Sequence, residues 1–187
     1  TTGTNNVAVG KDALNDNTTA SANTAIGTGT LSKTITGANN TAVGFASLLV
    51  NTASNNTTVG AYSLCDNTTG ASNTGLGYSS LDSNTEGDNN VAVGADALNK
   101  NTTADNNTAV GMSALKLNTT GSGNTAVGIT SLICNTTGVD NVAVGRCALY
   151  CNTTASGNTA LGGSSMIVNT TGCQNTAVGQ QSLKNNT

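Results

Sequence analysis

Asn107–Gly123 reads NTAVGMSALKLNTTGSG, and units of this pattern fill the whole chain. Eleven copies align on an opening Asn, at a spacing of 17 residues except for 16 between Asn40 and Asn56. We number the positions of each copy from that Asn: position 5 is always Gly, and position 9 is Leu in ten copies and Met166 in the other. The copies open at Asn6, Asn23, Asn40, Asn56, Asn73, Asn90, Asn107, Asn124, Asn141, Asn158 and Asn175.

Tandem repetition of such short units is typical of solenoid proteins, in which each unit buries its apolar row only by stacking on its neighbours. The repeat therefore predicts an all-β fold, a parallel β-solenoid or β-roll of eleven coils. We expect one repeat domain over residues 1–187 and interpret it as a segment of a longer array. The residue missing near Ala53–Asn55 should lie in a turn.

The composition excludes a conventional globular core. The chain has one Phe, no Trp, no His and no Pro, and only 8% of its residues are charged. Since aromatic and long aliphatic side chains supply most of the area of an ordinary core, this core must be thin and repetitive. The net charge is −3 and no basic stripe exists, so we expect no nucleic-acid partner. No apolar run approaches the roughly 18 residues that cross a bilayer, so we expect no membrane insertion of this segment.

Strand alternation assigns the faces of each coil. We expect positions 2 and 4 to point inward, together with the Leu of position 9 and the first Thr of the N-T-T unit. Position 3 then points outward, and its small residues predict close packing against another chain. The competing interpretation, with Ala in a narrow interior and the Val and Thr rows outside, stays open because the strands are short. The candidate chain-packing row is Ala92, Ala109, Ala126, Ala143, Ala160 and Ala177.

The sequence offers no constellation for catalysis. Catalysis needs unlike groups that converge, whereas a repeat array presents the same group at every step. Without His, acid–base work would fall to carboxylates or Lys. Asp12 and Asp96 share a position but lie five copies apart, and Asp16 and Asp66 share another, three copies apart. We expect no enzyme activity, no cofactor and no metal site, since clustered ligands are missing as well.

Two of the five cysteines share a register. Cys134 and Cys151 both occupy position 11 of successive copies, so their Cα atoms should stack about 4.8 Å apart, inside the disulfide window. A disulfide between them is therefore plausible. Cys65, Cys147 and Cys173 have no partner in register, and the pattern does not fit a zinc site.

The N-T-T unit has two interpretations. Each of its Asn residues opens an N-x-[ST] acceptor pattern for an N-glycan, if the chain passes a secretory pathway. The other interpretation is a corner ladder in which Asn amides bond from coil to coil. The row consists of Asn17, Asn67, Asn101, Asn118, Asn135, Asn152 and Asn169.

The stretches NNVAVGADAL at Asn89–Leu98 and DNVAVG at Asp140–Gly145 resemble the head repeats of trimeric autotransporter adhesins. Similar N-T-A-V-G arrays occur in fibre proteins of phages and large viruses. The resemblance covers the whole chain and implies a β-roll that trimerises. The 17-residue repeat and its N-T-T unit depart from the shorter adhesin repeat.

Two classes of function follow. The first is a structural or adhesive fibre segment, a stiff rod on an extracellular, cell or virion surface, which forms a homo-oligomer such as a trimer or a filament. A surface receptor or a glycan would be a further partner. The alternative is an ice-binding solenoid that offers ordered hydroxyl and methyl groups from one outward rank. That rank contains Thr103, Thr120, Thr137, Thr154 and Thr171.

Overall fold

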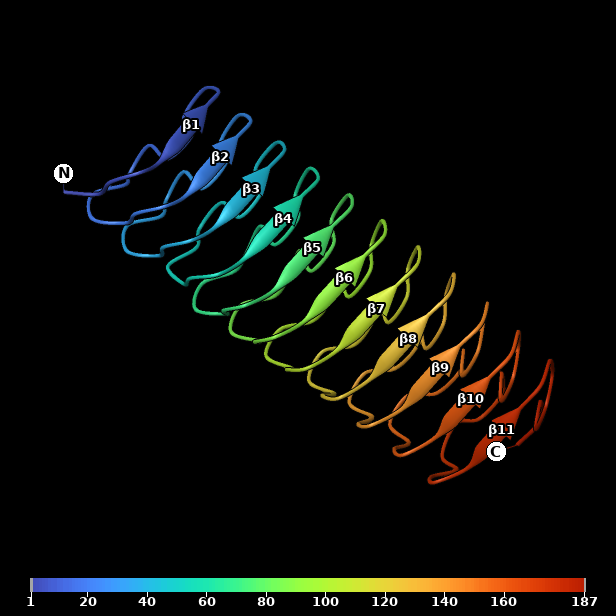
Figure 1. The fold of residues 1–187 in the computed structure, drawn as a ribbon. Helices are drawn as coiled ribbons and strands as arrows, with labels where there is room; N and C mark the ends of the chain where they lie inside the picture. The colour runs from blue at the N-terminus through green and yellow to red at the C-terminus, as the bar shows by residue number, and fades with distance from the viewer. Residues whose placement is uncertain (1, 187) are drawn as a thin grey trace.

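The computed structural model describes residues 2–186 as a parallel β-solenoid and confirms the predicted fold class (Figure 1). Each coil contributes one three-residue strand, and the eleven strands form one parallel sheet in sequence order. The strands are β1 Val7–Val9, β2 Thr24–Ile26, β3 Thr41–Val43, β4 Thr57–Val59, β5 Thr74–Leu76, β6 Val91–Val93, β7 Thr108–Val110, β8 Thr125–Val127, β9 Val142–Val144, β10 Thr159–Leu161 and β11 Thr176–Val178.

A glycine ends every strand because the backbone turns sharply there. The position 5 residues have φ between 119° and 140°, a region that side chains rarely tolerate. Space is a second reason: a Cβ added to Gly94 would lie 2.7 Å from the backbone C and O of Gly111 in the next coil. The fifth residue therefore has to be Gly in every coil that stacks on another.

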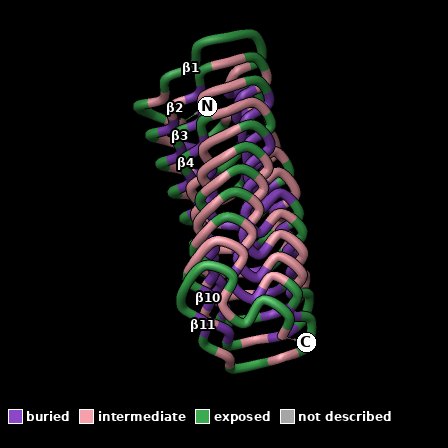
Figure 2. The backbone as a smooth tube through the Cα atoms, turned by 90° about the vertical axis from the view of Figure 1, so that its right-hand side faces the viewer, coloured by how far each residue is buried: buried purple, intermediate pink, exposed green. Residues whose placement is uncertain are grey.

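The core contains alanine from the strand and leucine from the opposite wall. The strand alanines from β6 to β10 are fully buried, and so are the position 9 residues from Leu31 to Met166 (Figure 2). Position 9 has left-handed φ values of 45–53°, so Leu adopts an unfavourable backbone conformation in each coil. We infer that packing of the leucine row offsets this cost.

The face assignment that placed Ala outside is wrong, and the competing interpretation is right. Ala92, Ala109, Ala126, Ala143, Ala160 and Ala177 point inward, so this row does not pack against another chain. The strand neighbours at positions 2 and 4 are half-buried or exposed instead. The physical reason is width: the leucine row fills the coil, which leaves room for only a methyl group on the strand side.

The first Thr of the N-T-T unit also points outward, contrary to expectation. Thr102 is half-buried and Thr68 is exposed. The hydroxyl of Thr102 donates to the carbonyl of Thr119, its counterpart in the next coil, at 3.1 Å. This hydroxyl ladder uses carbonyls along the loop, whereas an inward Thr would have to bury its hydroxyl in the leucine core.

Two asparagine ladders run inside the corners of the rod. At position 12, Nδ2 of Asn101 donates to Oδ1 of Asn84 at 2.7 Å and to the carbonyl of Ala104 at 2.9 Å. At position 1, the backbone N–H of Asn90 donates to Oδ1 of Asn73 at 2.9 Å. Both rows are buried in the middle of the rod. Each amide thus satisfies polar groups that the coil corners would otherwise bury without partners.

The third coil omits its residue in a loop, as predicted. Asn40 donates to the carbonyl of Ala53 at 2.9 Å, and Asn23 and Asn56 make the same bond to Gly37 and Gly70, which occupy position 15. Ala53 therefore stands at position 15, and the missing residue is that of position 14. The strands on either side keep their register.

Candidate interaction surface

The outward face of the sheet presents two parallel ranks of small, mostly apolar side chains. Strand pairing places Thr108 beside Thr125 and Val110 beside Val127, so each rank advances by one strand spacing per coil and extends for roughly 50 Å. The position 2 rank is Val7, Thr24, Thr41, Thr57, Thr74, Val91, Thr108, Thr125, Val142, Thr159 and Thr176. The position 4 rank is Val9, Ile26, Val43, Val59, Leu76, Val93, Val110, Val127, Val144, Leu161 and Val178. We call these two ranks the sheet face.

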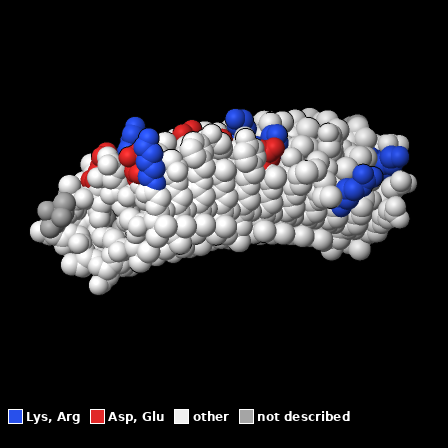
Figure 3. All heavy atoms as spheres, turned by 90° about the horizontal axis from the view of Figure 1, so that it is seen from above, with Lys and Arg blue, Asp and Glu red and all other residues white. Residues whose placement is uncertain are grey.

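The sheet face is exposed and uncharged. Neither rank contains a charged residue, and the aliphatic side chains of Val59, Val110 and Leu161 are 45%, 37% and 37% exposed. Figure 3 looks down on the rod and shows the visible Lys, Arg, Asp and Glu side chains along one edge, while the opposite concave edge has none. A long apolar strip of this kind is unusual on a solvated surface.

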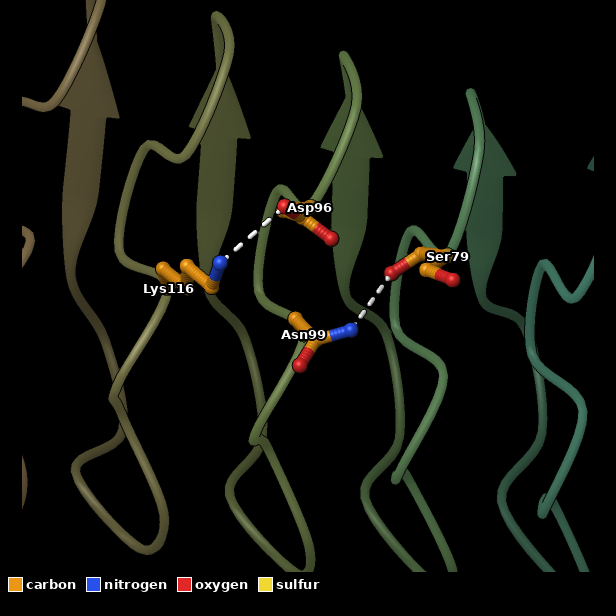
Figure 4. A network of polar contacts seen from close by, with 4 residues as sticks. All are labelled: Ser79, Asp96, Asn99 and Lys116. Carbon is orange, nitrogen blue, oxygen red and sulfur yellow. Dashed lines mark hydrogen bonds and ion pairs between the residues drawn. The ribbon is translucent and has the colours of Figure 1, made fainter.

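The charged side chains lie on the loops instead. Lys116 reaches back one coil, and its Nζ donates to Oδ2 of Asp96 at 3.0 Å (Figure 4). Asn99 reaches back in the same way and donates to the carbonyl of Ser79 at 3.0 Å. Burial raises the pKa of the Asp82 carboxyl on this side, and the carboxylate of Asp66 raises it further. These contacts join neighbouring coils and bring no set of reactive groups together.

The N-T-T asparagines form the predicted ladder. Six of the seven, all except half-buried Asn17, are fully buried. Asn118, Asn135 and Asn152 each donate from Nδ2 to Oδ1 of the preceding member, at 2.9–3.1 Å. A glycan has no room on a buried amide, so the glycan interpretation does not fit the folded rod at these six positions.

The predicted ice-binding rank is exposed but narrow. Thr103, Thr120, Thr137, Thr154 and Thr171 follow the corner ladder on a bend, away from the sheet. It remains a single rank, interrupted by the short third coil and by Glu86. The paired ranks of the sheet face were missed. Their signal in the sequence was the constant small residue between them, which marks an inward row.

Three of the four aromatic residues of the chain meet on successive turns beside the sheet. The rings of Phe45 and Tyr62 have centroids 5.3 Å apart, and those of Tyr62 and Tyr78 are 6.1 Å apart, both edge to face. All three are exposed, between 37% and 58%. Edge-to-face contact favours such pairs beyond the area they bury, so the cluster helps to hold coils 3 to 5 together.

Cys134 and Cys151 lie on adjacent coils as predicted, and both are free and half-buried. Among residues 2–186, no three His, Cys, Asp or Glu side chains lie together as a metal site would require. The same residues contain no helix with the length and hydrophobicity needed to span a bilayer. A comparison of the chain with known protein families, with characterised proteins and with solved structures finds no match.

Proposed function

We propose that this chain is a stiff segment of a fibre on an extracellular, cell or virion surface, and that it associates with other copies through the sheet face. The observation that carries the proposal is the position 4 rank, an exposed row of Val, Ile and Leu along the whole rod. Large exposed apolar patches are characteristic of interfaces. The partners we propose are therefore further copies, as a trimer or a filament.

A second copy fits this face better than an unrelated protein does. The face repeats at every coil, so an identical face can match it coil for coil along the rod. Its Thr and Val side chains are short, which lets two sheets approach to about the 10 Å of ordinary sheet packing. The face also contains no charge that would need a partner or would be buried without one.

Val127→Lys tests the proposal. Light scattering of the parent should give a multiple of the 18.3 kDa chain mass, and the variant should be a folded monomer. Ile129→Lys is the matched control, because Ile129 is an equally apolar, exposed residue just after the strand. It should keep the parent mass. A parent that is monomeric at micromolar concentration contradicts the proposal, as does a Val127→Lys variant that remains assembled.

Ice binding is the second candidate, and one observation favours it. The sheet face supplies two ranks in register, with Thr at position 2 and Val at position 4, where the sequence suggested only one rank. Such a face offers a regular lattice of methyl and hydroxyl groups to ordered water. In this case the parent would be a monomer with thermal hysteresis, and Thr125→Lys would abolish it. Thr120→Lys, in the other Thr rank, is the control. An assembled parent without hysteresis excludes this function.

A further inference from the structure

We propose that Cys134 and Cys151 are a modification site at which a small oxidised disulfide compound closes a covalent staple between coils 8 and 9. Coil 8 opens at Asn124 and coil 9 at Asn141, and each cysteine occupies position 11 of its coil. The inference does not depend on the function of the sheet face, because position 11 belongs to the loop side of the rod.

The backbone holds the two cysteines at the same height in their coils. The N–H of Cys134 donates to the carbonyl of Tyr150 at 3.3 Å, and the N–H of Cys151 donates to that of Ile167 at 3.0 Å. Each cysteine is thus bonded to position 10 of the following coil. Coils joined in this register are about 4.8 Å apart, within the range of about 4.4–6.8 Å between the Cα atoms of a disulfide.

No other cysteine has such a partner. The counterpart of Cys147 in the preceding coil is Thr130, whose Oγ1 lies 3.3 Å from the Cys147 sulfur. The counterpart of Cys173 is Ser156, whose N–H lies 3.5 Å from the Cys173 sulfur. Cys65 has Asp82 as its counterpart in the following coil. The pairing is therefore specific to one of the ten possible pairs among five cysteines.

The chemistry is thiol–disulfide exchange with a compound such as oxidised glutathione. The thiolate of one cysteine attacks the small disulfide, forms a mixed disulfide and releases one small thiol. The second cysteine then attacks the protein sulfur, forms the Cys134–Cys151 bond and releases the second small thiol. Both protein sulfurs are partly accessible to solvent, so the reagent can reach them. Burial raises the pKa of the Cys134 thiol, and the neighbouring Cys151 raises it further, so the exchange should be faster at alkaline pH.

The staple would act locally, because each coil of a solenoid is stabilised mainly by its two neighbours. A closed loop of 17 residues restricts the unfolded chain and holds coils 8 and 9 together when the rod opens. Amide hydrogen exchange in residues 124–157 should slow by roughly 10- to 100-fold after oxidation. Exchange in the first coils should change far less.

The test is oxidation of the folded chain with oxidised glutathione, followed by thiol counting and peptide mapping without reduction. The parent should fall from five free thiols to three and yield a single cross-linked peptide pair, Cys134 with Cys151. Cys147→Ser should form the same link, and Cys134→Ser should form none. The inference is overturned if all five thiols persist, if both cysteines retain glutathione, or if another pair is linked.

A link between two copies must be distinguished from a link within one. The oxidation is therefore repeated on Val127→Lys, which the proposed function expects to be monomeric. A monomeric product with the Cys134–Cys151 link supports the staple whether or not the parent assembles. A covalent dimer through these cysteines, seen on a non-reducing gel, overturns it.

Discussion

Coils 2 to 5, residues 23–89, have the same fold as coils 6 to 10, residues 90–174, but a different interior. In the second block position 3 is Ala in every coil. In the first block it changes from Ala25 and Ala42 to Thr58 and Gly75. The first block also contains the 16-residue coil and the aromatic cluster. We call the two parts the irregular block and the regular block.

The irregular block shows how narrow the interior is. The hydroxyl groups of Ser47 and Thr58 are hydrogen-bonded at 2.6 Å, so the larger residue at position 3 has a polar partner at position 8 of the preceding coil. In the next coil a Cβ added to Gly75 would lie 2.5 Å from Oγ of Ser63 and 3.1 Å from Oγ of Ser80. Changes at position 3 are thus matched by the residues opposite, as close packing requires.

The two blocks also differ in their asparagine ladder. The position 12 ladder runs without a break from Asn51 through the regular block to Asn186. Position 12 of coil 2 is Thr34, which is fully buried and whose Oγ1 has no hydrogen-bond partner. The ladder therefore stops one coil short of Thr34. We expect the interfaces of coil 2 to be weaker than those of the regular block.

The strongest test of the common interior is Ala126→Arg in the regular block. Ala126 is fully buried, so Arg would bury a charge and exceed the available volume. We expect the fold to be lost, at a cost of more than about 4 kcal/mol. Thr125→Arg, one residue away on the sheet face, should stay folded. Circular dichroism during denaturant unfolding measures both, and a folded Ala126→Arg would show that position 3 does not face the core.

Asn118→Thr transfers the fault at Thr34 into the regular block. It removes the amide that donates to Asn101 and to Gly121 and that accepts from Asn135. The loss of these buried bonds should cost about 2–3 kcal/mol in free energy of unfolding. Lys116→Ala, which lies nearby and is partly exposed, should cost less than about 1 kcal/mol. An equal loss in both variants would mean that the ladder adds little stability.

Ala126→Thr transfers the Thr58 arrangement without its partner. The new hydroxyl would be buried opposite Ala114, which occupies the place that Ser47 has relative to Thr58. We expect a loss of about 1–2 kcal/mol. The double variant Ala126→Thr/Ala114→Ser supplies the missing hydroxyl and should recover part of that loss. If the double variant is less stable than the sum of the two single changes, the polar pair of the irregular block needs its own surroundings.

Thr34→Asn should repair the irregular block. The new amide can donate to the carbonyl of Gly37, as its counterparts in other coils do, and accept from Asn51. We expect a gain of about 1 kcal/mol and a higher unfolding temperature. Hydrogen exchange should slow in coils 2 and 3 more than elsewhere. A gain spread evenly over the rod, or no gain at all, would contradict a local fault.

The smallest expected effect is a pH dependence in the irregular block. Burial, together with the carboxylates of Asp66 and Asp82, raises the pKa of the Cys65 thiol from 9.0 to about 11. Between these values the unfolded chain loses this proton and the folded chain keeps it, so stability falls as the pH rises from 9 to 11. Cys65→Ser should lack this part of the decline. Unfolding midpoints across this pH range for the parent and the variant measure the difference.

The sequence by itself determined the solenoid, the number of coils and the inward leucine row. These follow from strict periodicity, because a unit of 17 residues can bury Leu only against the same residue of its neighbours. It also indicated the asparagine ladder as one of two alternatives and the position of the missing residue in a loop. Each of these features repeats in every coil or breaks the repeat visibly.

Only the tertiary structure decided which side of the strand faces the core. A three-residue strand such as Val91–Val93 satisfies alternation with Ala inside or with Val inside, and hydrophobicity alone favoured the wrong choice. The width left by the leucine row selects the methyl group of Ala92 and exposes the valines. That one decision converts an expected core into the sheet face. The aromatic cluster and the fault at Thr34 likewise depend on contacts between coils, which no single repeat contains.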